Sequence, residues 1–352
     1  MSCSNSIRRH AWSRCVLAAA LLAVAFITGP RAALSADNTK PRFQIKFATL
    51  APEGSTWMKT MHEIDVEVRR RTDNRLGFKF YPGGVQGDEK EVLRKIRTGQ
   101  LHGGGFTGFG LGAVAPEVRV NELPFMFRSL DELDHLRGKT DPHFEGLFAD
   151  KGFLHLGWAD VGFIYLFSKQ PIRSPDDLAK ARMWVWAGDP LAELFFKAFD
   201  LSPIPLSAPD VLTALQTGVI DAVYGSALSC IALQWFTRID YVTDVPLTHG
   251  MGAALVSRSA LKDVDPADVK VLTEVSRPLL RALTEKTRVQ NEEAMGELRK
   301  EGVQVIEVTP DVRAEFFRVG RSSWKDGVGR LYPQELLDRV DSILNEYRAS
   351  TP

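Results

Sequence analysis

The chain is poor in cysteine and has no excess of charge of either sign. Cys3, Cys15 and Cys230 stand far apart, so they form neither a CxxC metal motif nor a disulfide scaffold. The 44 lysines and arginines equal the 44 aspartates and glutamates, a balance that argues against a nucleic-acid partner. We therefore expect neither a metal site nor nucleic-acid binding.

Motifs that carry catalysis are also missing. The sequence has no HExxH, GxSxG or GxxxxGK[ST] pattern, and its seven histidines show no metal-ligand spacing. The segment 110–115 fits a dinucleotide fingerprint, but Pro116 interrupts the helix that should follow. We expect the glycines of 103–112 to let a loop approach a ligand or packed neighbours closely. The sequence thus predicts no catalytic residue and no cofactor, although an exported α/β enzyme stays a competing hypothesis.

Long apolar runs are absent beyond the N-terminus. Arg8, Arg9 and Arg14 precede an apolar stretch of 12 residues at 16–27, and small residues lead to Ala36. This order is typical of a secretory signal over residues 1–36, cleaved near Ala36; the alternative is a retained anchor. We expect a soluble mature chain in the periplasm. Loss of the leader would leave 40 basic residues against 44 acidic ones.

The remaining sequence alternates strand and helix patterns. Apolar residues alternate at 43–47 and 76–80, and helical patterns cover 52–72 and 88–99. This order predicts a parallel sheet covered by helices. Strand patterns return at 162–168, 183–186 and 219–224, and a long helical pattern runs from Pro266 to about Glu301. The 352 residues therefore predict two α/β domains.

Aromatic residues gather near the predicted strand ends, where clefts form in α/β sheets. Packing in the core is the alternative role for each of them. In the segment 183–188 we expect one of Trp184 and Trp186 to face the cleft while the other packs.

Four segments together carry a resemblance to a known family. They are 47–52 (FATLAP), 80–87 (FYPGGVQG) followed by Glu89, 121–127 (NELPFMF) and 213–221 (TALQTGVID). Their order resembles the DctP-type substrate-binding proteins of tripartite ATP-independent periplasmic (TRAP) transporters. The resemblance covers nearly the whole mature chain.

The resemblance implies an α/β, two-lobed periplasmic-binding-protein (Venus flytrap) fold with a long helix crossing both lobes. On this basis residues 37–160 plus 250–289 form lobe I, and 161–249 plus 290–352 form lobe II. A small-molecule solute would close the cleft, and a TRAP membrane permease would receive it. We expect the receptor to be a monomer and not an enzyme.

The chain departs from the family where the family binds carboxylates. Trp184 stands at the position of the family's arginine, Ile164 at that of a second arginine, and Gly225 at that of an asparagine. These replacements favour an apolar or aromatic ligand, because a buried carboxylate would lack its partner. A carboxylate held by Arg182 and a shuttle for lipids or other hydrophobic molecules are the alternatives. The residues expected to bind the ligand are Trp57, Phe106, Phe109, Trp158, Phe163, Arg182, Trp184, Trp186, Tyr224 and Ser226.

Overall fold

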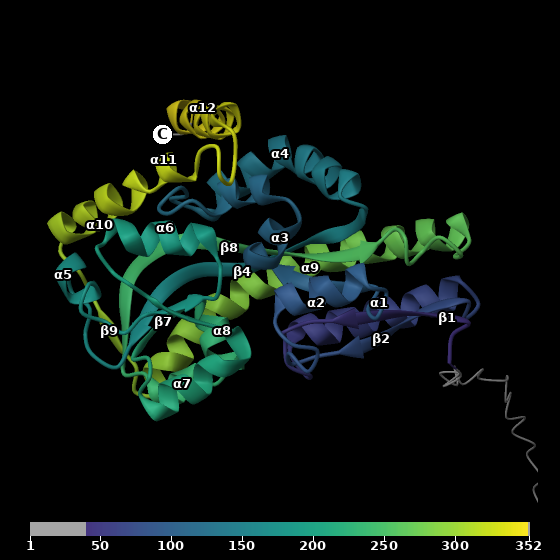
Figure 1. Cartoon of the computed structure of the whole chain (residues 1–352), viewed down its shortest axis with the longest axis horizontal. Coiled ribbons are helices and arrows are strands. Elements are labelled where there is room, and N and C mark those ends of the chain that lie inside the picture. Colours follow the sequence, from purple (N-terminus) through teal and green to yellow (C-terminus); the bar gives the residue numbers. More distant parts are fainter. Residues whose placement is uncertain (1–39, 351–352) are drawn as a thin grey trace, which may run out of the picture. The chain divides into compact units, whose positions relative to one another are not determined.

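A computed structural model describes residues 40–350. The predicted secretory signal at residues 1–36 lies outside the described residues. Among the helices of residues 40–350, none combines the length and the apolar character needed to cross a bilayer. The described residues form one unit (Figure 1).

Several strands lie near their predicted positions, but the strand predicted at 162–168 is much longer, and the sequence predicts no strand at 103–107 or 241–257. The strands are β1 (Phe43–Ala48), β2 (Leu76–Tyr81), β3 (Gly103–Thr107), β4 (Phe153–Ser168), β5 (Trp184–Trp186), β6 (Ile204–Leu206), β7 (Ala222–Gly225), β8 (Tyr241–Ser257) and β9 (Gln304–Ile306).

Helices connect these strands. They are α1 (Thr56–Arg71), α2 (Glu89–Arg97), α3 (Gly108–Val114), α4 (Leu130–Asp150), α5 (Pro175–Leu178), α6 (Pro190–Ala198), α7 (Val211–Thr217), α8 (Ala227–Ala232), α9 (Pro266–Lys300), α10 (Pro310–Ser322), α11 (Trp324–Gly327) and α12 (Gln334–Ser350), with 3-10 turns η1 (Pro116–Glu122), η2 (Ala208–Asp210) and η3 (Trp235–Arg238).

The main sheet is mixed rather than parallel, which corrects the sequence prediction. Its strand order is β2-β1-β3-β8-β4-β7, and β9 pairs with β8 outside this path. β1 runs parallel to β2 and β3, whereas β8 runs antiparallel to β3 and β4. The two long strands β4 and β8 form an antiparallel pair along most of their length, and this pair connects the two ends of the sheet. No local sequence pattern reveals this pairing, because it joins segments about 90 residues apart.

Capping residues decide where the first helices begin. Ser55 accepts a hydrogen bond from the backbone of Met58 at 3.2 Å, so α1 starts at Thr56 rather than near Pro52. Asp88 accepts from the backbone of Glu89 at 2.7 Å and caps α2, as its place in the sequence predicts. Seven residues separate the end of β1 from α1, and seven separate the end of β2 from α2.

The glycine-rich segment is a strand and a helix, not the predicted loop. Residues 103–107 form β3 between β1 and β8, and α3 follows at once. Glycine is required at Gly108, where an added Cβ would overlap the carboxylate of Glu122. At Gly108 the missing side chain therefore makes room for a side chain of the same protein.

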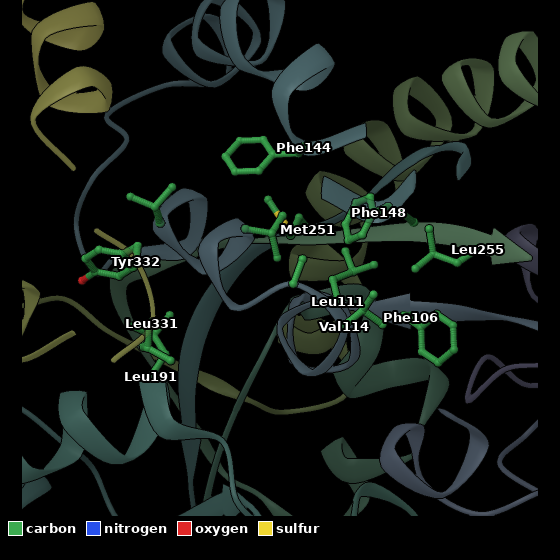
Figure 2. Packing of buried hydrophobic residues seen from close by; sticks show 14 of the residues in the cluster. Phe106, Leu111, Val114, Phe144, Phe148, Leu191, Met251, Leu255, Leu331 and Tyr332 are labelled. Atoms are coloured by element: carbon green, nitrogen blue, oxygen red, sulfur yellow. The ribbon is translucent and has the colours of Figure 1, made fainter. Parts of the chain in front are cut away.

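Apolar side chains pack on both faces of the sheet. One cluster joins α3, α4 and β8 and includes Leu111, Phe144, Phe148 and Met251, shown in Figure 2. In Figure 1, β1, β2, α1 and α2 gather near one end of α9, while β7, β9, α7 and α8 gather near the other.

The C-terminal helix α12 packs against α4, which belongs to the other predicted lobe. The boundaries of the two predicted lobes stay a prediction.

Candidate functional site

A cavity of about 560 Å³ lies where several strands end. The segments that follow β1, β3, β5 and β7 all contribute to its lining. The long strands β4 and β8 and the middle of α9 complete it. Six of the predicted ligand-binding residues line this cavity: Trp57, Phe106, Phe109, Trp184, Trp186 and Tyr224.

One wall of the cavity is aromatic. Phe109 stacks on Trp186 with ring centroids 4.8 Å apart, and Trp184 stacks on Tyr224 at 4.9 Å. Trp235 meets Trp184 edge-on at 5.3 Å. We call Phe109, Trp184, Trp186, Tyr224 and Trp235 the aromatic wall. Such rings offer large apolar faces whose geometry is fixed by their neighbours.

The two strand tryptophans lie on the same side of β5 and both line the cavity, whereas only one of them was expected to face it. Their ring centroids are only 5.5 Å apart, because residues two positions apart on a strand share a face. Trp184 is 1% exposed, and its indole donates to the carbonyl of Leu206 at 3.1 Å. Trp186 is half-buried, so it offers more of its ring to the cavity than Trp184 does.

Trp186 also bonds the start of α2. Its indole Nε1 donates to Asp88 Oδ2 at 2.7 Å, and the backbone of Ala208 donates to the same oxygen at 3.3 Å. Lys90 Nζ donates to the carbonyl of Gly188 at 2.9 Å. These bonds join the start of α2 to β5 and to the start of η2.

A buried ion-pair cluster, which sequence analysis missed, forms part of another wall. Arg119 lies between two carboxylates, with Nε 3.0 Å from Glu122 Oε2 and Nη2 3.1 Å from Asp189 Oδ2. Burial lowers the pKa of Arg119, but Asp189 and Glu122 outweigh it, so the pKa is raised and the charge is kept. Burial raises the pKa of Glu122 despite Arg119. We call these three residues the Arg119 cluster.

Every member of the Arg119 cluster is held by the protein itself. Asp189 Oδ1 caps α6 by accepting from the backbone of Leu191 at 3.0 Å. Glu122 Oε1 accepts from the backbone of Met251 at 2.9 Å. Arg119 and Asp189 are 70 residues apart in the chain, and only Glu122, within 121–127, belongs to a segment singled out in the sequence.

Glu89, the first residue of α2, is a second buried carboxyl on the cavity. It accepts from the backbone of Thr107 at 2.8 Å and of Gly110 at 2.7 Å. Burial raises its pKa to about 8 in spite of these donors. The side chain thus carries little negative charge at neutral pH.

Asp160 of β4 anchors a further buried cluster beside the cavity. It pairs with Arg137 of α4 and with Arg288 of α9, whose Nε lies 2.8 Å from Asp160 Oδ2. Burial favours a higher pKa, but Arg137, His249 and Arg288 hold the pKa of Asp160 below its usual value. Burial lowers the pKa of the neighbouring His249 to about 4, so this imidazole is neutral.

Four predicted ligand-binding residues lie outside the lining: Trp158, Phe163, Arg182 and Ser226. Trp158 packs on His155, with ring centroids 4.7 Å apart, and Phe163 meets His249 edge-on at 5.2 Å. Ser226 caps α8 by accepting from the backbone of Ser229 at 3.2 Å.

Arg182, the alternative anchor for a carboxylate, precedes the strand that carries Trp184. β5 begins at Trp184, so the alternation of a strand does not extend back to residue 182. The side chain of Arg182 is 56% exposed and pairs with Asp221 at 3.1 Å.

Comparison with known proteins identifies the family. Residues 47–329 match the model of DctP, the bacterial extracellular solute-binding protein, family 7. The chain belongs to this family. Members of the family bind solutes, so the chain is a binding protein rather than an enzyme, and the DctP resemblance seen in the sequence is confirmed.

Individual relatives share about a quarter of their residues with the chain. A solute-binding protein of Verminephrobacter eiseniae is 28% identical over 78% of this chain and 81% of its own length. One of Chromohalobacter salexigens is 26% identical over 61% of this chain, and the match spans 62% of that relative.

A solved structure confirms the two-lobed α/β fold. It is a TRAP periplasmic solute-binding protein of Sulfurospirillum deleyianum with bound succinate, and it superposes with a TM-score of 0.80. The two chains are 18% identical, and the match covers 86% of this chain and 99% of the other.

Proposed function

We propose that the chain is a periplasmic receptor that captures an apolar or aromatic solute in the cavity and delivers it to a TRAP permease. Support for capture comes from family membership and from the cavity itself. Support for the extracytoplasmic location comes from the family description and from the leader-like residues 1–36. Monomeric state stays a prediction, to be checked by light scattering.

One observation carries the ligand class: the cavity has an aromatic wall, and its buried cation is already neutralised. Arg119 is held by Glu122 and Asp189, and Lys59 is exposed on α1. A buried carboxylate without its own cation loses hydration that nothing replaces. An uncharged ring, in contrast, gains both apolar burial and stacking here.

The three positions at which the family resemblance places polar anchors support the same conclusion. Trp184, Ile164 and Gly225 all line the cavity. They present an indole, an alkyl group and a bare backbone where an arginine or an asparagine would offer hydrogen bonds to a carboxylate. The alternative anchor Arg182 is largely exposed and bound to Asp221. The residues therefore favour a ligand unlike the succinate of the Sulfurospirillum protein.

The proposal is tested by identifying the solute that the protein carries. The full chain is expressed with its leader, isolated without dialysis and denatured, and the released compounds are identified by mass spectrometry. We expect an apolar or aromatic compound without a carboxylate, retained by Arg182→Ala and lost from Trp186→Ala. Trp186 is a better test residue than Trp184, whose removal would open a hole in the core. A dicarboxylate or uronate that is lost from Arg182→Ala would contradict the proposal.

A further inference from the structure

Three polar atoms in the cavity lining are buried and have no hydrogen-bond partner. One is Nε of Arg119, which faces Glu122 Oε2 at 3.0 Å within the Arg119 cluster. The other two belong to uncharged side chains: the indole Nε1 of Trp57 on α1 and the amide oxygen Oε1 of Gln290 on α9. Leaving a buried donor or acceptor without a partner costs free energy, because the group loses its hydrogen bonds to water and gains none in return. A structural role in the core does not explain Trp57 and Gln290, because both residues face a cavity that a ligand can enter.

The Trp57 ring is held in place by a glycine of β3. A Cβ added at Gly105 would lie 2.5 Å from Cζ2 and 3.1 Å from Cε2 of Trp57, so the ring lies directly against the strand. The atom Cε2 is bonded to Nε1, and the donor is therefore fixed in position together with the ring. A donor fixed in advance loses little freedom when it binds a ligand.

Trp57 and Gln290 lie on corresponding stretches of α1 and α9, which pack against each other. Arg71 near the end of α1 bonds Glu274 of α9 at 2.5 Å, and Arg75 bonds Asp268 further toward the start of α9. The two helices therefore run in opposite directions. Residue 57 lies 14 residues before Arg71 on α1, and residue 288 lies 14 residues after Glu274 on α9. At about 1.5 Å per residue, both are roughly 21 Å from the Arg71–Glu274 pair, in the same direction. Gln290 lies within one turn of residue 288.

The chemistry of the two groups specifies what fits between them. An indole N–H only donates, whereas a carboxamide can turn to donate or to accept. Neither group carries a charge, and both sit among apolar and aromatic side chains. A group that offers one acceptor and one donor without a charge satisfies both.

We propose that Trp57 and Gln290 form a polar subsite that recognises an uncharged carboxamide or lactam group on the solute. This inference rests on the proposed function, since it assumes that an apolar or aromatic solute fills the rest of the cavity. The carbonyl oxygen accepts from Trp57 Nε1, and the amide N–H donates to Gln290 Oε1. The aromatic wall contacts the apolar body of the solute.

The test uses three probes that share one ring system: 2-naphthamide, 2-naphthoate and 2-methylnaphthalene. Their binding to the mature protein is measured by equilibrium dialysis. We expect the amide to bind about tenfold more tightly than the hydrocarbon, which corresponds to about 1.4 kcal/mol. Trp57→Phe keeps a ring against Gly105, and Gln290→Leu keeps the bulk of the side chain. Each should reduce amide binding to the level of the hydrocarbon and leave hydrocarbon binding unchanged.

Val289→Ala is the matched control, because Val289 adjoins Gln290 but is 55% exposed and outside the lining. Equal binding of amide and hydrocarbon, unaffected by Trp57→Phe and Gln290→Leu, would overturn the subsite and leave the apolar ligand class intact. Binding of 2-naphthoate alone, or of no probe, would overturn the ligand class as well. Having two variants keeps the subsite testable even if Trp57→Phe is poorly folded.

Discussion

The aromatic wall and the Arg119 cluster line the same cavity but are built on opposite principles. The rings of the aromatic wall touch one another through their faces and edges, and Trp186 still offers part of its surface. The charged groups of the Arg119 cluster pair with one another, and both carboxylates also accept from backbone amides. An incoming solute can therefore gain apolar contact from the first wall, while the second mainly holds the protein together.

This difference matters because charge and shape select ligands in different ways. A buried arginine without a carboxylate partner in the protein would bind any ligand carboxylate of suitable size, since charge-assisted hydrogen bonds are strong. Where the arginine is neutralised and lies beside stacked rings, a ligand gains binding free energy by burying apolar surface instead. The three predictions that follow test this division, starting with the largest expected effect.

Removing the cation of the Arg119 cluster should destabilise the fold strongly. Arg119→Met leaves Glu122 and Asp189 buried and facing each other, so we expect the free energy of unfolding to fall by about 3–5 kcal/mol. Urea denaturation followed by circular dichroism measures the change. Arg182→Met is the matched control, because its exposed pair with Asp221 contributes less than about 1 kcal/mol. Similar small losses for both variants would show that the Arg119 cluster is not a structural element.

The buried imidazole beside Asp160 should make stability depend on pH. Its folded pKa of about 4 lies below the ordinary value of 6.5, so only the unfolded chain takes up a proton between these pH values. The free energy of unfolding therefore falls as the pH drops from 6.5 toward 4, by up to about 1.4 kcal/mol per pH unit.

His249→Leu should flatten this dependence in urea unfolding series between pH 4.5 and 7. Both ring nitrogens lack a hydrogen-bond partner, so leucine leaves no new unsatisfied group. A pH profile identical to that of the wild type would show that other groups cause the slope.

The bond between Trp186 and Asp88 should couple β5 to the start of α2 by about 1 kcal/mol. Asp88→Asn keeps an oxygen to cap α2 but can place an N–H₂ opposite the indole donor. Trp186→Phe keeps a ring against Phe109 and removes the donor. Unfolding free energies of both single variants and the double variant form a cycle, in which we expect the losses to be less than additive. Strict additivity would mean that the 2.7 Å contact does not stabilise the protein.

Local sequence was a good guide to the elements but a poor one to their partners. Alternation and caps predicted β1, β2 and α2 closely, because these features depend on neighbouring residues. Alternation did not predict β3 in the glycine-rich segment, because glycine has no side chain and so shows no apolar pattern. This segment forms a strand between β1 and β8. Alternation also does not show that Arg182 precedes its strand, because the start of β5 is set by pairing with β6.

The candidate site shows the same division. Strand ends and the family resemblance pointed to aromatic residues, and six of the predicted residues line the cavity. Trp158 and Phe163 are also aromatic residues near predicted strand ends, but they pack on histidines outside the cavity. Sequence alone could not separate the two groups, since facing a cavity and facing the core both favour aromatic side chains.

The sequence by itself determined several helices and strands and the family, and it predicts that Trp184, Ile164 and Gly225 replace the family's polar anchors. Only the tertiary structure decided that these positions meet in one cavity and that Arg119 is neutralised there by Asp189, 70 residues away. Local patterns depend on residues within one or two turns of each other. The charge balance of a buried site depends on segments that the long strands β4 and β8 bring together, and these contacts exist only in the folded chain.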